Sequence, residues 1–402
     1  MSAIFQGKKI VLGVTGGIAA YKAVELLRLL VSAGAQVQVV MTQSAQEFVT
    51  PLTFQTLSGE PVRTGLFGPE ADPLEHISLA QAVDALVIAP ATANCLGKMA
   101  AGIGDDLLTT LVLAATRPIL VCPAMNVKMY ENPVVQENLE RLRRRGFHLM
   151  PPDMGEMACG AYGSGRLPEP VAIVEALAAI LSPKDLQGYQ ILVSAGPTHE
   201  DLDPVRFLTN RSTGKMGYAL ARMAQRRGAA VCLVSGPTAL APPPGVERHL
   251  VRSALEMQQA LVTRFPQTDA LIMSAAVSDY RPAGCAEQKI KRGSEEMLVK
   301  LTHNPDILAS LGALKTRQVM VGFAAETQDI LQHAQQKLER KHLDLIVAND
   351  VSAPDSGFAV DTNQVTLIHR SGEAESLPLL SKEDVADRVL DRVAALLAER
   401  QR

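Results

Sequence analysis

Short apolar runs alternate with amphipathic stretches along the first half of the chain. The runs have the length of buried strands, and the stretches between them carry apolar residues at helical spacing. We expect strands at residues 9–14, 36–41, 85–89, 119–122 and 147–150, and helices at 21–31, 101–115, 133–145 and 171–181. This alternation indicates a mostly parallel sheet with helices on both faces.

The second half repeats this pattern after a polar linker at residues 182–188. Strands are expected at 190–196, 230–235, 270–275, 319–324, 345–348 and 364–369, and a final helix at 382–400. Because 402 residues exceed what one core usually serves, we expect two domains, 1–187 and 188–402. The predicted fold class is α/β, with two Rossmann-like domains that each hold a mostly parallel sheet between helices.

Composition narrows the class of protein. Apolar residues make up 47% of the chain and charged residues 20%, which is ordinary for a soluble globular protein. The 39 basic and 42 acidic residues give no net field that would attract nucleic acid or anionic membrane, and no apolar run approaches the ~20 residues of a membrane span. Five cysteines without a Cys-x-x-Cys pair, and an N-terminus without a signal-peptide pattern, fit a reducing cytosol. We expect a cytoplasmic protein that acts on small molecules, without a zinc site.

The first strand runs into a glycine-rich turn at residues 13–17, Gly-Val-Thr-Gly-Gly. Such a turn directs backbone N–H groups and a helix N-terminus at one point, which suits a phosphate. The dinucleotide fingerprint G-x-G-x-x-G is absent, because Thr15 stands where its second glycine belongs. The second strand also ends at Thr42, without the acid that would bind a ribose. The pattern favours a mononucleotide such as FMN, and a tight turn without a ligand is the alternative.

Other candidate residues follow the ends of later strands, where ligands of open α/β sheets bind. Ala91 and Thr92 follow the third strand, and Asn126 follows the fourth. Asn126 can donate and accept hydrogen bonds in a cleft, or be an ordinary loop residue. His76 lies in a loop-to-helix stretch, and its imidazole suits a proton acceptor, although lone histidines are more often structural.

Residues 155–166 place four glycines around the thiol of Cys159. Glycine adds little buried surface and loses much backbone entropy, so this segment is a poor core and a good flap over a ligand. On such a flap Cys159 would donate a proton, because a thiol with a pKa near ~8.5 stays protonated at neutral pH. Arg166 would bind an anion. The alternative is a surface loop with an incidental cysteine.

Together these motifs resemble the homo-oligomeric flavin-containing Cys decarboxylases. The resemblance is carried by Gly16, Gly17, Ile18 and Ala19, by His76, by residues 123–130 and by Ala158-Cys159-Gly160. It implies that FMN is bound by residues 16–19, with Thr42, Ala91 and Thr92 nearby, and that the flavin oxidises a cysteinyl unit so that its carboxylate leaves as CO₂. It also implies that His76 is the base, Asn126 holds the substrate carboxylate and Cys159 protonates the intermediate.

The second half has its own polar opening at residues 195–217. It is not a Walker P-loop, because Thr209 and Met216 stand where glycine and a hydroxyl residue are required. The segment holds Arg206 and Asn210 before a helix start, and these groups suit an anionic ligand.

Later residues extend this candidate site. Ser274 and Ala275 follow a strand and let a flat ligand approach, and Asp279 can accept a hydrogen bond from a base or a ribose. A loop lysine such as Lys289 would stabilise charge on a transferring phosphoryl group if the loop closed, although such lysines are usually solvated surface. From the residues alone, this part of the chain could be either a nucleotide site or an ordinary solvated surface.

This second pattern resembles phosphopantothenate–cysteine ligases, and the order of the two halves resembles the bifunctional coenzyme A biosynthesis proteins of bacteria. The resemblance implies CTP and Mg²⁺, an acyl-cytidylate promoted by Lys289, and its transfer to cysteine with the help of Asn210. The residues it places around the substrates are Arg206, Ser274, Ala275, Asp279, Lys289, Pro305, Asp306, Ile307, Leu308, Phe323, Lys337 and Lys341. It leaves the protein ligand of Mg²⁺ open. One departure is Leu167, where the family leads us to expect methionine, an apolar side chain of similar volume.

The resemblance further implies an assembly and a reaction order. The C-terminal domain would make 4′-phosphopantothenoylcysteine and the N-terminal domain would decarboxylate it to 4′-phosphopantetheine. Trimers of one domain and dimers of the other would give a dodecamer. Two rivals are a flavin prenyltransferase, which needs no thiol flap, and a non-enzymatic flavoprotein regulator, which would not need Lys289, Asn210 and Asp279.

Overall fold

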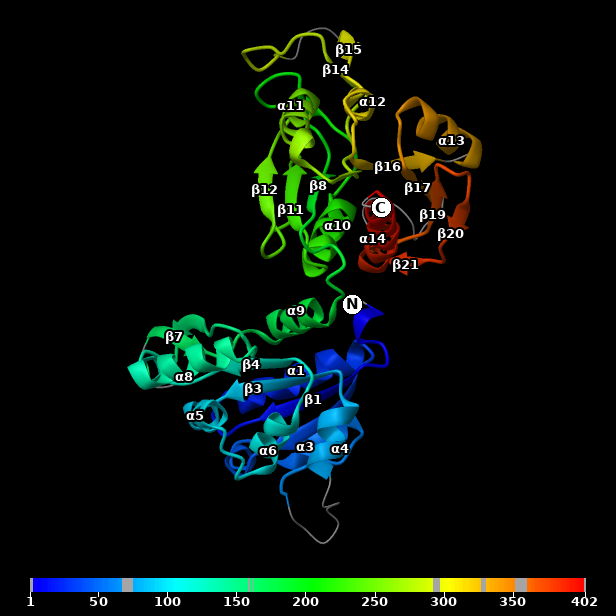
Figure 1. Cartoon of the computed structure of the whole chain (residues 1–402). Helices are drawn as coiled ribbons and strands as arrows, with labels where there is room; N and C mark the ends of the chain where they lie inside the picture. The colour runs from blue at the N-terminus through cyan, green and yellow to red at the C-terminus, as the bar shows by residue number, and fades with distance from the viewer. Residues whose placement is uncertain are drawn as a thin grey trace. The chain divides into compact units, whose positions relative to one another are not determined.

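The computed structural model describes residues 3–66, 75–157, 160, 162–291, 297–326, 330–350 and 360–400. It divides into two compact units, Ser2–Ser182 and Pro183–Arg402 (Figure 1). Among the helices in these ranges, none is both long enough and apolar enough to cross a bilayer.

The N-terminal unit is built on one parallel sheet of five strands. In spatial order they are β2 (Gln36–Met41), β1 (Lys9–Val14), β3 (Ala85–Ala91), β4 (Ile119–Pro123) and β5 (His148–Leu149). These are the strands predicted from the apolar runs, with the last one shorter. Because β1 lies between β2 and β3, the chain reverses its direction of winding at the end of β1, which is where open sheets bind ligands.

Helices cover both faces of this sheet, as the alternation predicted. One face packs on α1 (Ala20–Ser32), α3 (Pro51–Ser58) and α9 (Pro170–Leu181). The other packs on α4 (Glu75–Ala82), α5 (Ala93–Ala101), α6 (Leu107–Ala114) and α8 (Pro133–Arg144). Shorter elements are η1 (Ala3–Phe5), α2 (Gln43–Gln46), α7 (Val127–Tyr130) and the antiparallel hairpin β6 (Asp153–Glu156) with β7 (Tyr162–Arg166).

The prediction of one helix over residues 101–115 is wrong. Gly102 adopts a left-handed conformation and ends α5, and Asp106 begins α6 by accepting a hydrogen bond from Thr109 N–H at 2.8 Å. Thr109 in turn accepts a bond from the Asp106 backbone N–H, which completes a capping box. The apolar residues on both sides of this break disguised it in the sequence.

The C-terminal unit holds a mixed sheet of eight strands. Their order is β12 (Glu247–Leu250), β11 (Ala230–Ser235), β8 (Gln190–Ala195), β13 (Ala270–Met273), β16 (Val319–Glu326), β17 (Leu345–Asp350), β19 (Val365–His369) and β20 (Ala374–Ser376). The first six are parallel, and β19 and β20 are antiparallel. The prediction of a mostly parallel sheet is confirmed, and β8 lies at the reversal point between β11 and β13.

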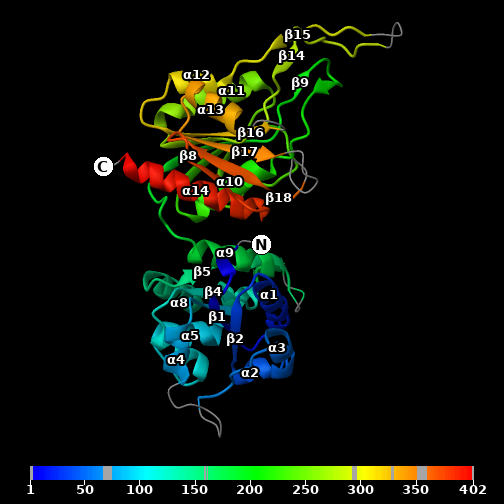
Figure 2. The same cartoon turned by 90° about the vertical axis from the view of Figure 1, so that its right-hand side faces the viewer.

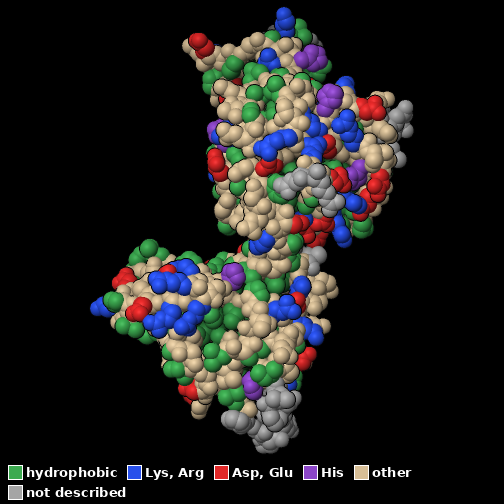
Figure 3. All heavy atoms as spheres, viewed as in Figure 1, with side chains coloured by type: hydrophobic (Ala, Val, Ile, Leu, Met, Phe, Trp, Pro, Cys, Tyr) green, Lys and Arg blue, Asp and Glu red, His purple; other side chains and the backbone are tan. Residues whose placement is uncertain are grey.

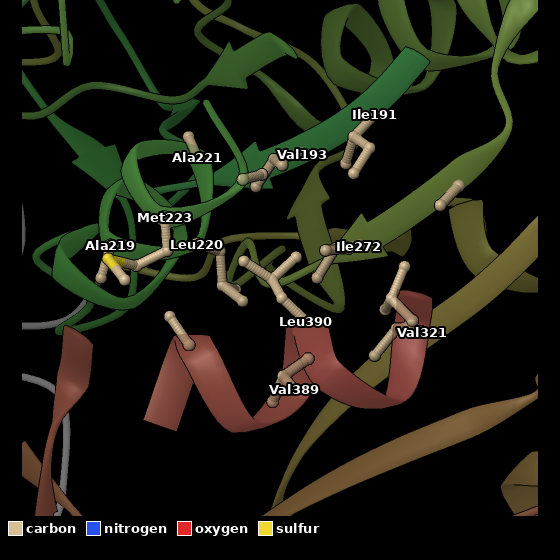
Figure 4. Close-up of a cluster of buried hydrophobic side chains, with 14 of the residues drawn as sticks. Ile191, Val193, Ala219, Leu220, Ala221, Met223, Ile272, Val321, Val389 and Leu390 are labelled. Carbon is tan, nitrogen blue, oxygen red and sulfur yellow. The ribbon is translucent and has the colours of Figure 1, made fainter. Parts of the chain in front are cut away.

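The core of this unit forms where the strands meet two helices, α10 (Lys215–Arg226) and α14 (Lys382–Glu399). Figure 4 shows Ile191, Val193 and Ile272 of the sheet facing Leu220 of α10 and Leu390 of α14. The opposite face of the sheet packs on α11 (Ala254–Arg264), α12 (Ile307–Ala313) and α13 (Ile330–Arg340). Small elements at the margins are η2 (Phe265–Gln267) and the hairpins β9 (Glu200–Asp201) with β10 (Phe207–Leu208), β14 (Tyr280–Pro282) with β15 (Leu301–His303), and β18 (Thr362–Asn363) with β21 (Leu380–Ser381).

Candidate active sites

A cleft of ≈ 1130 Å³ lies at the carboxyl edge of the first sheet. It is formed by the segments that follow β1, β2, β3 and β4 and by the β6–β7 hairpin. The predicted residues that line it are Gly16, Gly17, Ile18, Ala19, Thr42, Thr92, Asn126 and Arg166. Residues that are more than 100 positions apart in the chain therefore share one cavity, as the rule for strand ends predicted.

The floor of the cleft is fixed by Thr15. Its hydroxyl donates to Pro90 O at 2.7 Å and accepts from Thr92 N–H at 3.1 Å, so the ends of β1 and β3 are joined. Gly16 passes so close to the next segment that a Cβ would lie 2.4 Å from the Cβ of Ser44. Only glycine fits this close approach, which brings the start of α1 to the cleft.

Threonine hydroxyls begin two helices at the same edge. Thr42 accepts from Ala45 N–H at 3.3 Å at the start of α2, and Thr92 accepts from Cys95 N–H at 3.4 Å at the start of α5. Residues at the starts of α1 and α5 line the same cleft, so the positive ends of two helix dipoles lie at this edge and favour an anionic group.

The β6–β7 hairpin closes another side of the cleft beside Asn126. Met125 donates its backbone N–H to Gly165 O at 2.9 Å, and a Cβ on Gly165 would lie 2.2 Å from Met125 O. Asn126 accepts from Lys128 N–H at 2.9 Å and so caps α7. The segment predicted to be a flap is therefore a docked hairpin at its base, while Cys159 lies outside the described residues.

Two predicted residues do not line this cleft. Ala91 is fully buried, and its carbonyl accepts from Ala124 N–H at 3.1 Å, so it joins β3 to the segment after β4. His76 is half-buried in the first turn of α4, a helix that packs on α6. His76 is thus not among the residues that line the cleft with Asn126 and Arg166.

Charged residues that the sequence analysis missed also reach the cleft. Lys98 lies 2.7 Å from Asp105 and 3.2 Å from Asp106, and the hydrogen bond with Asp105 raises the pKa of Lys98. Lys22 lies 2.7 Å from Glu169. No sequence pattern identifies Lys98 and Lys22 as residues of the cleft, because their ion-pair partners come from other turns and helices.

A smaller pocket lies at the carboxyl edge of the second sheet. Its lining residues are Ser212, Thr213, Gly214, Lys215, Met216, Gly217, Ser274, Ala275, Ala276, Phe323, Ala324, Asn349, Asn363 and Lys382. Of the predicted residues it gathers Ser274, Ala275 and Phe323. Gly217 packs α10 tightly against β8, because a Cβ there would lie 2.5 Å from the Cβ of Ala195.

Two lysines face this pocket beside the N-terminus of α10. Lys215 forms an ion pair with Asp361 at 2.7 Å. Lys382 comes from α14, is 5% exposed and donates to Val360 O at 2.5 Å. Its burial, together with the charge of Lys215, lowers the pKa of Lys382 to about 8. Neither lysine was among the predicted site residues.

The other predicted residues of this unit lie outside the pocket lining. Asp306 caps α12 and lies 2.9 Å from Lys341, which follows α13. Asn210 donates its amide to Ala276 O and accepts from Ser212 N–H at 3.2 Å, so it adjoins two lining residues. The remaining residues, outside the lining as well, are Arg206, Asp279, Lys289, Pro305, Ile307, Leu308 and Lys337.

Figure 3 shows acidic side chains among the basic ones on the visible face, in agreement with a net charge of −3. Within the described ranges, no group of three or more His, Cys, Asp or Glu side chains is arranged to hold a metal ion.

Comparison with known proteins identifies both halves. The flavoprotein family model matches residues 4–182, and the model of the DNA/pantothenate metabolism flavoprotein C-terminal domain matches residues 186–397. The coenzyme A biosynthesis bifunctional protein CoaBC of Vibrio parahaemolyticus is 50% identical over 395 residues, 97% of this chain and 99% of that protein. The chain belongs to the family of bifunctional coenzyme A biosynthesis proteins.

A second relative and two solved structures are also similar to this chain. CoaBC of Escherichia coli K12 is 47% identical over 402 residues, covering 98% of this chain and 99% of that protein. The solved C-terminal domain of a CoaBC is 42% identical, with a TM-score of 0.47 over 54% of this chain and 99% of that one. A cysteine-to-serine mutant of a PPC decarboxylase, complexed with pantothenoylaminoethenethiol, is 34% identical with a TM-score of 0.39, over 43% of this chain and 97% of that one.

Family membership settles the general activity. The chain is a bifunctional enzyme of coenzyme A biosynthesis, with a flavoprotein decarboxylase domain first and a phosphopantothenate–cysteine ligase domain second. The prenyltransferase and regulator readings are set aside, since the similarity extends over both halves of the chain.

Proposed function

We propose that the C-terminal unit joins cysteine to 4′-phosphopantothenate at the expense of CTP, and that the N-terminal unit decarboxylates the product with FMN. The boundary between the two activities would lie within residues 182–188. The observation that carries the proposal is the N-terminal cleft, which combines helix N-termini, Asn126 and the base of the β6–β7 hairpin.

The residues of this cleft fit FMN. The turn at residues 16–19 and the hydroxyls of Thr42 and Thr92 supply donors for a phosphate, and the approach of Gly16 to Ser44 leaves no side chain in the way. Apolar side chains of Ile18 and Met129 line the same cleft and suit a flat ring system. When bound, the flavin supplies two-electron oxidation and reduction of the substrate.

The other residues would act on the substrate directly. The Asn126 amide would hold the carboxylate until CO₂ leaves, Arg166 would bind a second anionic group, and Cys159 would return the proton. His76 would act as the base. Because His76 does not line the cleft of its own chain, we propose that it acts across a contact between copies, in the homo-oligomer predicted from the sequence.

In the ligase unit, the pocket beside α10 supports a nucleotide site. Lys215 and Lys382 lie at a helix N-terminus, where a polyphosphate is stabilised. Mg²⁺ would arrive with CTP. Lys289 would promote the acyl-cytidylate, and Asn210 would steady it for attack by the cysteine amine. Asp279, residues 305–308, Lys337 and Lys341 would complete the surroundings of CTP.

Mass spectrometry of products tests both activities. The purified protein is mixed with 4′-phosphopantothenate, cysteine, Mg²⁺ and CTP. Formation of 4′-phosphopantetheine is the expected result. Formation of the cysteine adduct alone would overturn the decarboxylase assignment. The absence of both the adduct and CTP-dependent pyrophosphate release would overturn the ligase assignment.

A further inference from the structure

Asp203 has a carboxylate that is completely removed from solvent in the loop after β9. Its side chain is 0% exposed, yet it is fully hydrogen-bonded. One oxygen accepts from the backbone N–H groups of Val205 and Arg206, both at 2.8 Å. The other accepts from Arg206 Nε at 3.0 Å and Nη2 at 2.6 Å. Because two N–H groups of the guanidinium donate to this one oxygen, the guanidinium is held against the carboxylate by two charge-assisted bonds.

The same carboxylate also binds a second segment of the chain, residues 283–291, which follows β14. Its Oδ2 atom accepts from Ile290 N–H at 3.1 Å, and Arg206 Nη2 donates to Ile290 O at 2.8 Å. Both backbone groups of Ile290 are therefore bound by one ion pair. A third bond, from Ala286 N–H to Leu202 O at 3.0 Å, runs between the same two segments. Figure 2 shows β9 close to β14, the strand that precedes this second segment.

This second segment is also held at its start, where Ala283 N–H donates to Lys300 O at 2.9 Å. Residues 283–291 are exposed except at Ala286 and Ile290, which are half-buried, and Lys289 itself is exposed. The hydrogen bonds from Arg206 also hold the pKa of the Asp203 carboxyl well below its usual range, so the Asp203–Arg206 ion pair stays charged at neutral pH.

We propose that Asp203 is a positioning residue of the ligase reaction, which holds Arg206 and Lys289 as a pair of cations facing the same anionic substrate. This rests on the role proposed above for Lys289. An ion pair that fixes the residue next to a flexible lysine limits where its ammonium can reach, and displacements of ~1 Å can cost ~100-fold in rate. Asp203 itself touches no substrate.

The test compares Asp203→Asn with Asp201→Asn in the full chain. Asp201 lies two residues away and pairs with Arg252 through two bonds of 2.7 and 2.9 Å, and both side chains of this pair are exposed. Pyrophosphate release from CTP and 4′-phosphopantothenate is expected to fall about 100-fold in Asp203→Asn and to stay within about twofold in Asp201→Asn.

Two readouts separate positioning from a general loss of structure. In the double variant Asp203→Asn with Lys289→Gln, the losses are expected to be non-additive, because Asp203 acts through Lys289. Tryptic cleavage after Lys289, followed by mass spectrometry, is expected to accelerate at least about tenfold in Asp203→Asn only. Additive losses, or unchanged cleavage, would overturn the proposal.

A second variant covers the case in which Asp203→Asn does not fold. Ile290→Pro removes the N–H that Asp203 binds, and the same non-additivity with Lys289→Gln is expected. Because trypsin does not cleave a Lys–Pro bond, faster cleavage after Lys291 is the readout in this variant. If the wild type releases no pyrophosphate, the ligase proposal fails. If Lys289 then resists trypsin in the wild type and not in Asp203→Asn, Asp203 holds residues 283–291 in place without serving the ligase reaction. This result would also overturn the positioning role.

Discussion

The hydroxyl of Thr15 donates a 2.7 Å hydrogen bond to the carbonyl of Pro90, which joins the ends of two neighbouring strands beneath the N-terminal cleft. Thr15 is also the acceptor for Thr92 N–H, and it is 2% exposed. Thr15, which replaces the second glycine of the dinucleotide fingerprint, thus holds the strand ends beneath the site together; we call this pair of hydrogen bonds the clamp.

Replacing Thr15 by valine keeps the shape and removes the clamp. We expect Thr15→Val to lower the free energy of unfolding of this unit by about 1–3 kcal/mol, because a buried carbonyl and a buried N–H lose their partner. Release of flavin during denaturant titration of the full chain measures the change. Thr56→Val is the matched control, since its hydroxyl bonds Leu52 O on an exposed helix surface. Equal effects of the two substitutions would show that the clamp is not needed.

Cys159→Ser tests the proton donor of the decarboxylase. Because serine is a far weaker acid than cysteine, we expect CO₂ release with the flavin left reduced and an oxidised product retained. Absorbance of the flavin and the mass of the product report this state. Cys285→Ser changes an exposed thiol of the other unit and should leave turnover as it is. A normal yield of reduced product from Cys159→Ser would remove this thiol from the mechanism.

Much of this arrangement was predictable because it depends on local pattern. Strand and helix periodicity predicted the two mostly parallel sheets, and the reversal of winding beside β1 and β8 placed glycine-rich turns at the ligand edge. The strand β12 escaped prediction because it is an edge strand with an exposed, polar pattern, Glu247–Leu250.

Residues brought in by tertiary structure alone could not be foreseen. Lys382 follows the capping residue Ser381 of α14 and reads as the start of an ordinary surface helix, yet it is buried in the pocket beside Lys215. Likewise, His76 lies on α4, which packs on α6, and it does not line the cleft with Asn126; this packing has no signature in the sequence.

We expect Lys382 to make nucleotide binding by the ligase unit depend on pH. Burial lowers its pKa to about 8, so its charge is present below pH 8 and is lost as the pH rises through that value. If a nucleotide phosphate lies in this pocket, the KM for CTP should rise about tenfold between pH 7 and pH 9.5, as one charged contact of about 1.4 kcal/mol disappears.

The matched variant for this pH profile is Lys382→Arg, whose guanidinium stays protonated throughout. Its KM for CTP should be nearly flat over the same range, and that of Lys382→Met should be high and flat. A rise in the arginine variant equal to that of the wild type would assign the titration to another group.

Asn210→Asp should separate the two steps of ligation. The Asn210 amide donates to Ala276 O, and a carboxylate in its place would repel that carbonyl. We expect the variant to release pyrophosphate and accumulate the acyl-cytidylate, with transfer to cysteine lowered at least about 100-fold. Quenched-flow analysis of pyrophosphate and CMP measures the two steps. Asn304→Asp, which loses a similar bond to Ser278 O, should still transfer to cysteine. Normal CMP release in Asn210→Asp would contradict the assignment.

Arg227 joins the beginning of the C-terminal unit to its last helix. Its guanidinium is 2% exposed and lies 2.5 Å from Asp185, 3.1 Å from Asp387 and 2.8 Å from Asp391. Arg227→Met would leave these carboxylates facing one another, and we expect a loss of about 2–4 kcal/mol in the free energy of opening of α10 and α14 at pH 7. Hydrogen exchange of peptides from these helices measures it.

The stability deficit of Arg227→Met is expected to depend on pH, and to be larger at pH 7 than at pH 5. Burial already raises the pKa of Asp387 in the folded state, and removing Arg227 should raise it further. The folded variant then binds a proton more readily than the unfolded chain, so its deficit in stability should shrink as the pH falls from 7 to 5. Arg392→Met on the same helix removes only an exposed pair with Glu375 and should cost less than about 1 kcal/mol at either pH. A deficit for Arg227→Met that stays constant with pH would mean that repulsion among the carboxylates is not its cause.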